Sequence, residues 1–143
     1  MVVLVILIKA KVNGQSNCPN SSEITPCDCQ ESGINGLVQL SCTGRSINDS
    51  RINQILDICL SSPQTTNSLG SLYLFNNLLT RVPDQIKLFP QLVNITLNYN
   101  SITSLPSEAF NFTSSFHYLG LDGNQITNNI QPDTFQGKLI ENF

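Results

Sequence analysis

Three segments of the chain repeat one pattern of apolar and polar positions. They read LGSLYLFNNLL, LVNITLNYNSI and FHYLGLDGNQI and begin at residues 69, 92 and 116, so their spacings are 23 (92 − 69) and 24 (116 − 92) residues. Apolar residues occupy the first, fourth, sixth and eleventh positions, and Asn occupies the ninth. The alternation at the fourth and sixth positions predicts a short strand in each segment. The inward pairs are Leu72 and Leu74, Ile95 and Leu97, and Leu119 and Leu121.

The second half of each segment repeats as well. Equivalent apolar residues mark a return path at Val82, Leu105 and Ile130, and a second set is expected to fill the wide side of the core, at Ile86, Phe110 and Phe135. Successive segments would bury a core that no single segment can close alone. We therefore expect three repeats over 69–138, stacked as an α/β solenoid with short parallel strands along a concave face.

The spacing L-x-x-L-x-L-x-x-N-x-L resembles the leucine-rich repeat signature. The resemblance covers about half of the chain and implies a solenoid of the leucine-rich repeat class. Residues 139–143 are interpreted as the truncated start of a further repeat, so the C-terminal cap is missing from this sequence. The repeated amides Asn77, Asn100 and Asn124 are expected to form a structural ladder, because Asn can both donate to and accept from backbone groups in the turns.

Upstream of the repeats, residues 50–60 have a helical period. Ile52, Ile55, Leu56, Cys59 and Leu60 share one face of the expected helix. Asp49 or Ser50 is expected to cap its start, and Pro63 to close the region. Cys59 is interpreted as a buried apolar thiol, and a partner cysteine on another chain is the alternative.

Four cysteines precede this helix, in the pattern C-x8-C-x-C-x12-C. Cys18, Cys27, Cys29 and Cys42 favour a disulfide framework over zinc, because structural zinc sites prefer a gap of two to four residues between paired cysteines. The spacing leaves the pairing open among three arrangements. The cluster is similar to the N-terminal cap of extracellular leucine-rich repeat proteins, which implies Cys18–Cys29 and Cys27–Cys42. The cap is expected to span residues 15–68.

The N-terminus predicts secretion. Val2–Ile8 is an apolar run too short to cross a bilayer, so we interpret residues 1–14 as a signal peptide, with a buried strand as the alternative. Four N-glycosylation sequons are present, but Asn, Ser and Thr are abundant enough to produce such motifs by chance. The candidate glycosylated residues are Asn20, Asn48, Asn94 and Asn111.

The segments CPNSSEITPCDC, INQILD and RVPDQIKLF resemble a narrower group. These are secreted arthropod leucine-rich repeat proteins similar to the non-catalytic subunit of oplophorus-luciferin 2-monooxygenase. The resemblance implies a secreted, non-catalytic scaffold or carrier subunit that binds a protein partner or a catalytic subunit. A fragment of a receptor ectodomain and a small extracellular-matrix protein are the alternatives.

Composition and motifs agree with a binding role. The net charge is −3 and only 12% of residues are charged, so nucleic acid is not an expected partner. We identify no catalytic constellation, cofactor motif or metal site in the sequence. A pair between Cys59 and the single histidine, His117, would require an exposed thiol. Outward strand positions instead suggest a concave binding surface, formed by Tyr73, Phe75, Thr96, Asn98, Tyr118 and Asp122.

Overall fold

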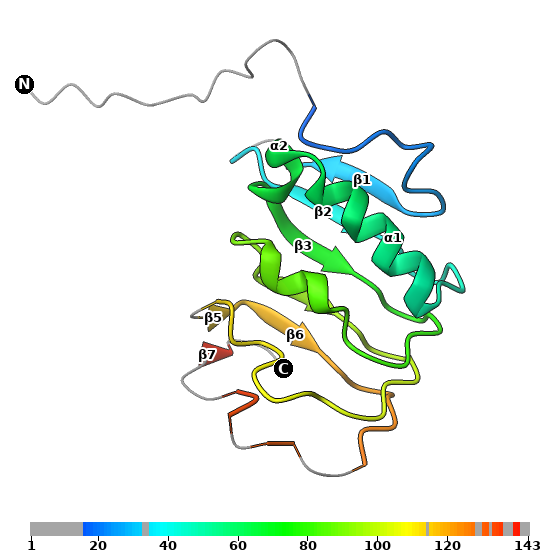
Figure 1. Cartoon of the computed structure of the whole chain (residues 1–143), viewed down its shortest axis with the longest axis vertical. Coiled ribbons are helices and arrows are strands. Elements are labelled where there is room, and N and C mark those ends of the chain that lie inside the picture. Colours follow the sequence, from blue (N-terminus) through cyan, green and yellow to red (C-terminus); the bar gives the residue numbers. More distant parts are fainter. Residues whose placement is uncertain are drawn as a thin grey trace, which may run out of the picture.

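The computed structural model describes residues 16–32, 35–113, 115–127, 130–131, 133–135 and 139–140. The expected signal peptide over 1–14 and residues 141–143 of the expected further repeat lie outside these ranges. A mixed sheet with the strand order β1-β2-β3-β4-β6 runs through the molecule (Figure 1). Its members are β1 (Asp28–Glu31), β2 (Val38–Ser41), β3 (Leu69–Tyr73), β4 (Asn94–Thr96) and β6 (Tyr118–Gly120).

The three repeated segments contribute β3, β4 and β6, which pair in parallel. Leu72 lies opposite Ile95, and Ile95 lies opposite Leu119, so equivalent repeat positions share one row. Backbone bonds continue beyond the strand ends, from Leu74 N to Thr96 O and from Leu97 N to Gly120 O, both at 2.8 Å. The spacing of 23 and 24 residues therefore sets the register of the sheet.

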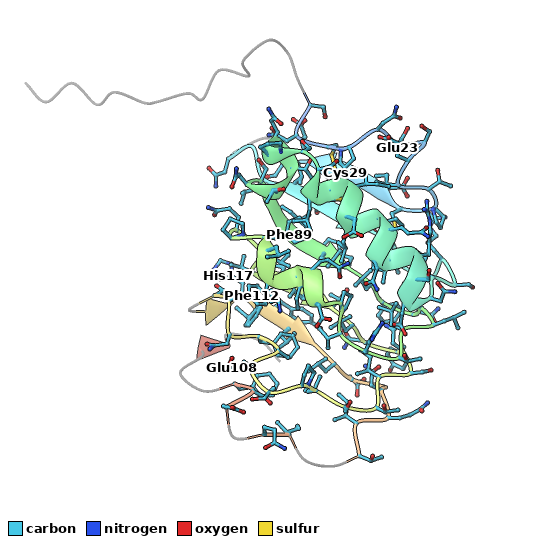
Figure 2. All side chains as sticks on the ribbon, in the orientation of Figure 1. Glu23, Cys29, Phe89, Glu108, Phe112 and His117 are labelled. Atoms are coloured by element: carbon cyan, nitrogen blue, oxygen red, sulfur yellow. A yellow bond between two sulfur atoms is a disulfide. The ribbon has the colours of Figure 1, made fainter. Side chains whose placement is uncertain are left out.

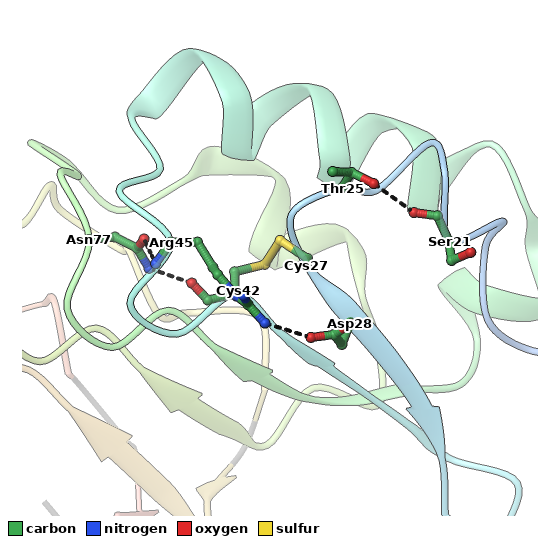
Figure 3. Close-up of polar contacts among 7 residues, drawn as sticks. All are labelled: Ser21, Thr25, Cys27, Asp28, Cys42, Arg45 and Asn77. Atoms are coloured by element: carbon green, nitrogen blue, oxygen red, sulfur yellow. Dashed lines mark hydrogen bonds and ion pairs between the residues drawn. A yellow bond between two sulfur atoms is a disulfide. The ribbon is translucent and has the colours of Figure 1, made fainter.

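The cysteine-rich segment adds two strands that the apolar pattern did not predict. β1 and β2 pair as an antiparallel hairpin, and β2 then pairs in parallel with β3 through an irregularity between Val38 and Gln39. The structure has two disulfides, Cys18–Cys29 and Cys27–Cys42, which are the pairs that the resemblance implies. The second is drawn in Figure 3 beside β1. Together the hairpin and disulfides cover the first edge of β3.

A helix, α1 (Asp49–Leu60), packs its apolar face against the core. Ile52, Ile55, Leu56 and Cys59 are buried along it. The expectation that Asp49 or Ser50 caps this helix was wrong. The cap is Asn48, whose side chain accepts from the backbone N–H of Arg51 at 2.9 Å. Asp49 instead accepts from the backbone N–H of Thr80 at 3.1 Å, which ties the helix start to the first repeat.

Two short helical segments complete the side of the molecule that carries α1. Pro63 was expected to close the region of α1. It is also the first residue of a second helix, α2 (Pro63–Thr66), a position at which the missing backbone N–H of proline is tolerated. A 3-10 helix, η2 (Asp84–Leu88), follows the first repeated strand and buries Ile86. Phe89, Phe112 and His117 lie on the side of the molecule where strands β3 and β6 begin, at the left in Figure 2.

The apolar interior lies on one face of the sheet. Leu72, Ile95 and Leu119 are fully buried there. Behind them an aromatic group fills the return side, where the ring of Phe110 meets Phe116 edge-on at 5.8 Å and stacks on Phe135 at 5.5 Å. Successive residues of a strand point to opposite faces, so the residues between the buried ones line the other face.

Some apolar residues of the third segment are more exposed than their equivalents in the first two segments. Val82 and Leu105 are each 4% exposed, whereas the equivalent Ile130 is 52% exposed. Phe135 is half-buried, whereas its equivalents Ile86 and Phe110 are buried. A second, short parallel pair lies here. It joins β5 (Ser115–Phe116) to β7 (Leu139–Ile140), with Phe116 opposite Ile140, which follows it by 24 residues (140 − 116).

Candidate binding surface

One face of the sheet is accessible, and we call it the open face. It carries Ser71, Asn94 and Tyr118 in one row, and Tyr73 and Thr96 in the next. Of the six residues predicted to line the binding surface, Tyr73, Thr96 and Asn98 are half-buried, while Phe75, Tyr118 and Asp122 are exposed. The structure therefore places all six on or directly after the three repeated strands.

The repeated amides fix the chain where it leaves each strand. Asn77 Oδ1 accepts from the backbone N–H groups of Arg45 and Ile47, at 3.1 and 2.9 Å, and its Nδ2 donates to the carbonyl of Cys42 at 2.8 Å. Figure 3 shows Asn77 reaching back toward Cys42 and Arg45. Asn100 repeats the arrangement one segment later, where its Oδ1 accepts from Leu79 N at 3.0 Å.

The third amide continues the series. Asn124 Oδ1 accepts from Ile102 N at 3.0 Å, and its Nδ2 donates to the carbonyls of Leu97 and Leu121, at 2.9 and 2.8 Å. Asn77 and Asn100 are each only 6% exposed. These amides satisfy buried backbone groups in the turns, and this structural use accounts for the polar residue within each apolar segment.

The residue before each of these amides has left-handed backbone. The φ angles are 56° at Asn76, 55° at Tyr99 and 70° at Gly123, and Gly44 extends the row into the hairpin with 64°. Gly and Asn adopt this conformation readily, whereas a bulky side chain is uncommon there. Tyr99 is therefore the exception in its row, and the outward-position pattern did not identify it.

The Tyr99 side chain is exposed and lies across neighbouring segments. Its ring meets the ring of Phe75 at a centroid distance of 5.3 Å and an angle of 61°. On the other side it covers Gly123, where an added Cβ would lie 2.7 Å from Tyr99 Cδ1. Tyr99 is 53% exposed and Phe75 40% exposed, so the pair forms an accessible aromatic feature beside the strands.

A second glycine makes room for an amide. A Cβ at Gly120 would lie 2.0 Å from Asn98 Oδ1, so the Asn98 side chain occupies the space over Gly120. Gly120 and Gly123 together allow the side chains of the second segment to lie over the third. Gly120 was expected at an outward strand position, whereas Gly123 did not figure in the sequence prediction, although a Gly in the same column as Asn76 and Gly44 is a signal for left-handed backbone.

The open face has little charge. No Lys or Arg occupies the described open-face positions 71, 73, 75, 76, 94, 96, 98, 99, 118 and 122, and Asp122 provides the one carboxylate among them. The other polar side chains at these positions carry hydroxyls and amides. Such groups both donate and accept hydrogen bonds, which suits them to uncharged polar ligands.

The four sequons have different surroundings. Asn20, Asn48 and Asn111 are exposed and lie outside the repeated strands. Asn94 is half-buried within β4, and its Nδ2 donates to Ser71 Oγ at 3.0 Å. A glycan on Asn94 would cover the middle of the open face, whereas glycans on the other three would not start from its strands.

The Cys59 thiol is buried within α1 and is 0% exposed. Burial raises the pKa of Cys59 from 9.0 to about 12, although a backbone hydrogen bond opposes the shift. The reactive species of a cysteine is the thiolate, which this environment disfavours. The exposed thiol that a pairing with His117 would require is therefore not observed.

Over the part of the chain that the structure describes, no group of three or more His, Cys, Asp or Glu side chains is arranged to hold a metal ion. The helices found within those same ranges do not have the length and apolar character that crossing a membrane requires.

A hollow of ≈ 620 Å³ lies at the β6 end of the molecule. Its apolar lining includes Leu121, Ile126, Ile130 and Phe135. One segment earlier, the equivalent positions Leu97, Ile102, Leu105 and Phe110 are buried. At the β6 end Ile126 and Phe135 are half-buried and Ile130 is exposed, so the hollow lies where the apolar interior is more accessible, and we do not assign it a ligand.

Comparison with known proteins gave no relatives. No protein-family model matches the chain, and neither a curated protein nor a solved structure matches it.

Proposed function

We propose that this protein is a secreted, non-catalytic scaffold of the leucine-rich repeat class, and that its open face binds another protein. The observation that carries the proposal is the set of accessible aromatic residues on that face, Phe75, Tyr99 and Tyr118. Aromatic side chains supply a large contact area with few rotatable bonds, and they are enriched among the residues that dominate binding energy.

The composition of the open face supports protein recognition. Its Tyr, Asn, Ser and Gly residues are the types enriched in antibody paratopes, where aromatic rings act as anchors and small polar groups adapt their hydrogen bonds. The strands beneath are held in register by the amides of Asn77, Asn100 and Asn124. A rigid support reduces the entropy that would otherwise be lost on binding.

The two disulfides are compatible with an extracellular location, because such bonds persist mainly in oxidising compartments. The partner would then be an extracellular protein or a catalytic subunit of a secreted assembly. A scaffold role also suits the accessible, nearly uncharged surface, since recognition by contact area and hydrogen bonds does not need a charged site.

Thr96→Arg is the sharpest test of this proposal. Thr96 lies in β4, the middle of the three repeated strands, and an arginine there would place a long cation at the centre of the open face. Leu74 N would keep its bond to the Thr96 backbone carbonyl at 2.8 Å, so the sheet should remain intact. The partner captured from extracellular fluid by the wild-type protein should be lost with this variant.

Leu88→Ala provides the matched control. Leu88 is 53% exposed but lies in η2, away from the repeated strands. Capture of the same partner should persist with this variant. Equal capture by the wild-type protein and Thr96→Arg, with both proteins folded by circular dichroism, would refute the open face as the binding surface.

A further inference from the structure

Two aromatic rings and two amides alternate where the first two repeated segments leave the sheet. Phe75 and Asn76 come from the first segment, and Asn98 and Tyr99 come from the second. Asn76 N donates to Asn98 O at 3.0 Å, so these two dipeptides are neighbours across the parallel pair. The order of ring and amide is reversed between the two dipeptides, and we call these four residues the ring–amide patch.

The backbone of Tyr99 is the unusual element of the patch. At φ 55° it holds a bulky residue in a conformation that its row otherwise gives to Gly or Asn. Strained residues of this kind concentrate at binding and active sites, where the surrounding structure keeps a side chain in place. Here Phe75 and Gly123 flank the ring and leave it 53% exposed.

The two amides of the patch differ from the buried ones. Within the described ranges, the side chains of Asn76 and Asn98 form no hydrogen bond with another residue, whereas Asn77 and Asn100 use both ends of their amides. A side-chain amide presents one acceptor and two donors, which complement the C=O and N–H of a peptide group. Two available amides on adjacent segments can therefore pair with the backbone of an extended chain.

The angle between the rings and the absence of charged side chains restrict the chemical class of the ligand further. The rings of Phe75 and Tyr99 are inclined at 61°, so they form an angled pair and not one continuous flat platform. A compact apolar side chain can contact both rings. Charge complementarity favours an uncharged ligand, because the four patch residues include no Lys, Arg, Asp or Glu side chain.

We propose that the ring–amide patch binds an uncharged, extended segment of a partner protein and holds a compact apolar side chain, such as proline, against the two rings. Aromatic surfaces are a recurrent means of recognising proline-rich extended segments, whose conformation is formed before binding. This inference rests on the proposed function and specifies the partner chemistry of the same face.

Peptide and glycan arrays test the ligand class directly. The probes are immobilised neutral, acidic and basic peptides, each with and without proline, beside neutral and sulfated oligosaccharides. The wild-type protein should bind neutral peptides containing proline or a compact aliphatic residue, with little change between low and high salt. Selection of charged peptides with salt-sensitive binding, binding to oligosaccharides alone, or binding to no peptide would overturn the inference.

Variants then separate this inference from the proposed function. Phe75→Ala and Tyr99→Asn should each weaken binding of the selected peptide by about tenfold or more, while Leu88→Ala leaves it unchanged. If Thr96→Arg abolishes partner capture but Phe75→Ala and Tyr99→Asn do not affect it, the open face still binds and the patch does not. If Thr96→Arg has no effect, the proposed function itself fails.

Discussion

Asn77 and Asn100 donate to the same carbonyl oxygen, that of Leu74, at 3.1 and 2.9 Å. One amide belongs to the same segment as Leu74 and the other to the next, so a single acceptor joins two successive turns. Asn100 and Asn124 share the carbonyl of Leu97 in the same way, at 3.0 and 2.9 Å. This sharing connects the repeats where the regular strand pairing ends, and it positions the side chains of the open face.

Asn100→Leu should therefore be strongly destabilising. The substitution removes a donor from Leu74 and Leu97 and an acceptor from Leu79 N. The Leu74 and Leu97 carbonyls keep Asn77 and Asn124 as donors, so Leu79 N is the group left unpaired. An unpaired buried N–H costs roughly 1–3 kcal/mol and each lost hydrogen bond about 1 kcal/mol, so the free energy of unfolding should fall by about 3 kcal/mol. Denaturant unfolding measures the change, with Asn98→Ala as the control, because the Asn98 side chain forms no hydrogen bond within the described residues. Equal stability of the two variants would contradict a structural role for Asn100.

The Cys27–Cys42 disulfide should stabilise the hairpin that covers the first edge of the repeats. Its cysteines are 15 residues apart, and cross-linking a loop of this size contributes about 3 kcal/mol in the chain-entropy account. The double variant Cys27→Ala, Cys42→Ala should lower the unfolding midpoint accordingly. Because the Cys42 carbonyl accepts from Asn77 Nδ2, amide exchange should also rise in the first repeat. An unchanged midpoint would contradict this assignment.

Burial of Cys59 predicts a loss of stability at high pH. In the folded protein its pKa is raised to about 12, whereas the unfolded thiol titrates near 9.0. Above pH 9 the unfolded state loses a proton that the folded state retains, so the contribution is complete below pH 9 and declines as pH rises toward 12. The additional slope should approach about 1.4 kcal/mol per pH unit.

Comparison with Cys59→Ala isolates this contribution. The variant lacks the thiol, so its stability should decline less steeply than that of the wild-type protein between pH 9 and 12, whatever its stability at pH 7. Denaturant unfolding at several pH values gives both slopes. Parallel curves for the two proteins would mean that the thiol is not buried as described.

Tyr99→Asn should affect stability much less than it affects binding. Relief of the left-handed strain gains about 1 kcal/mol, and loss of the ring contact with Phe75 costs a similar amount, about 1 kcal/mol. Phe75→Ala loses the same contact without relieving strain, so it should be the less stable of the two variants. Thermal unfolding compares them. A larger destabilisation from Tyr99→Asn would show that Tyr99 serves the fold and not a ligand.

The parts of the fold that depend on the regular spacing of apolar residues could be predicted from the sequence. Leu72, Ile95 and Leu119 recur at a fixed spacing because equivalent positions must meet in one row, and the invariant Asn follows from the turn that each strand enters. β1 and β2 were not predicted, because their short strands are stabilised by disulfides and by pairing with β3, which leave little periodic signal. Tertiary contacts decided their conformation.

The candidate surface was readable only in part. The alternation of apolar and outward positions identified Tyr73, Phe75 and Tyr118. This alternation ends with each strand, so it does not predict the orientation of the residues with left-handed backbone that follow the strands. Tyr99 belongs to that row, and its orientation depends on Gly123 and Phe75 in other segments. Gly44, Asn76 and Gly123 occupy the positions equivalent to Tyr99, and these residue types indicate a left-handed backbone there. The exposure of its ring could only be seen in three dimensions.

Site-specific photo-crosslinking tests the central claim most directly. The photoreactive residue p-benzoylphenylalanine would replace Tyr73, Tyr118 or Leu88, one at a time, and each protein would be irradiated in extracellular fluid. We predict that Tyr73 and Tyr118, on different strands of the open face, give crosslinks to one common partner and that Leu88 in η2 gives none to it. Crosslinking to that partner from Leu88 but from neither tyrosine would contradict the account.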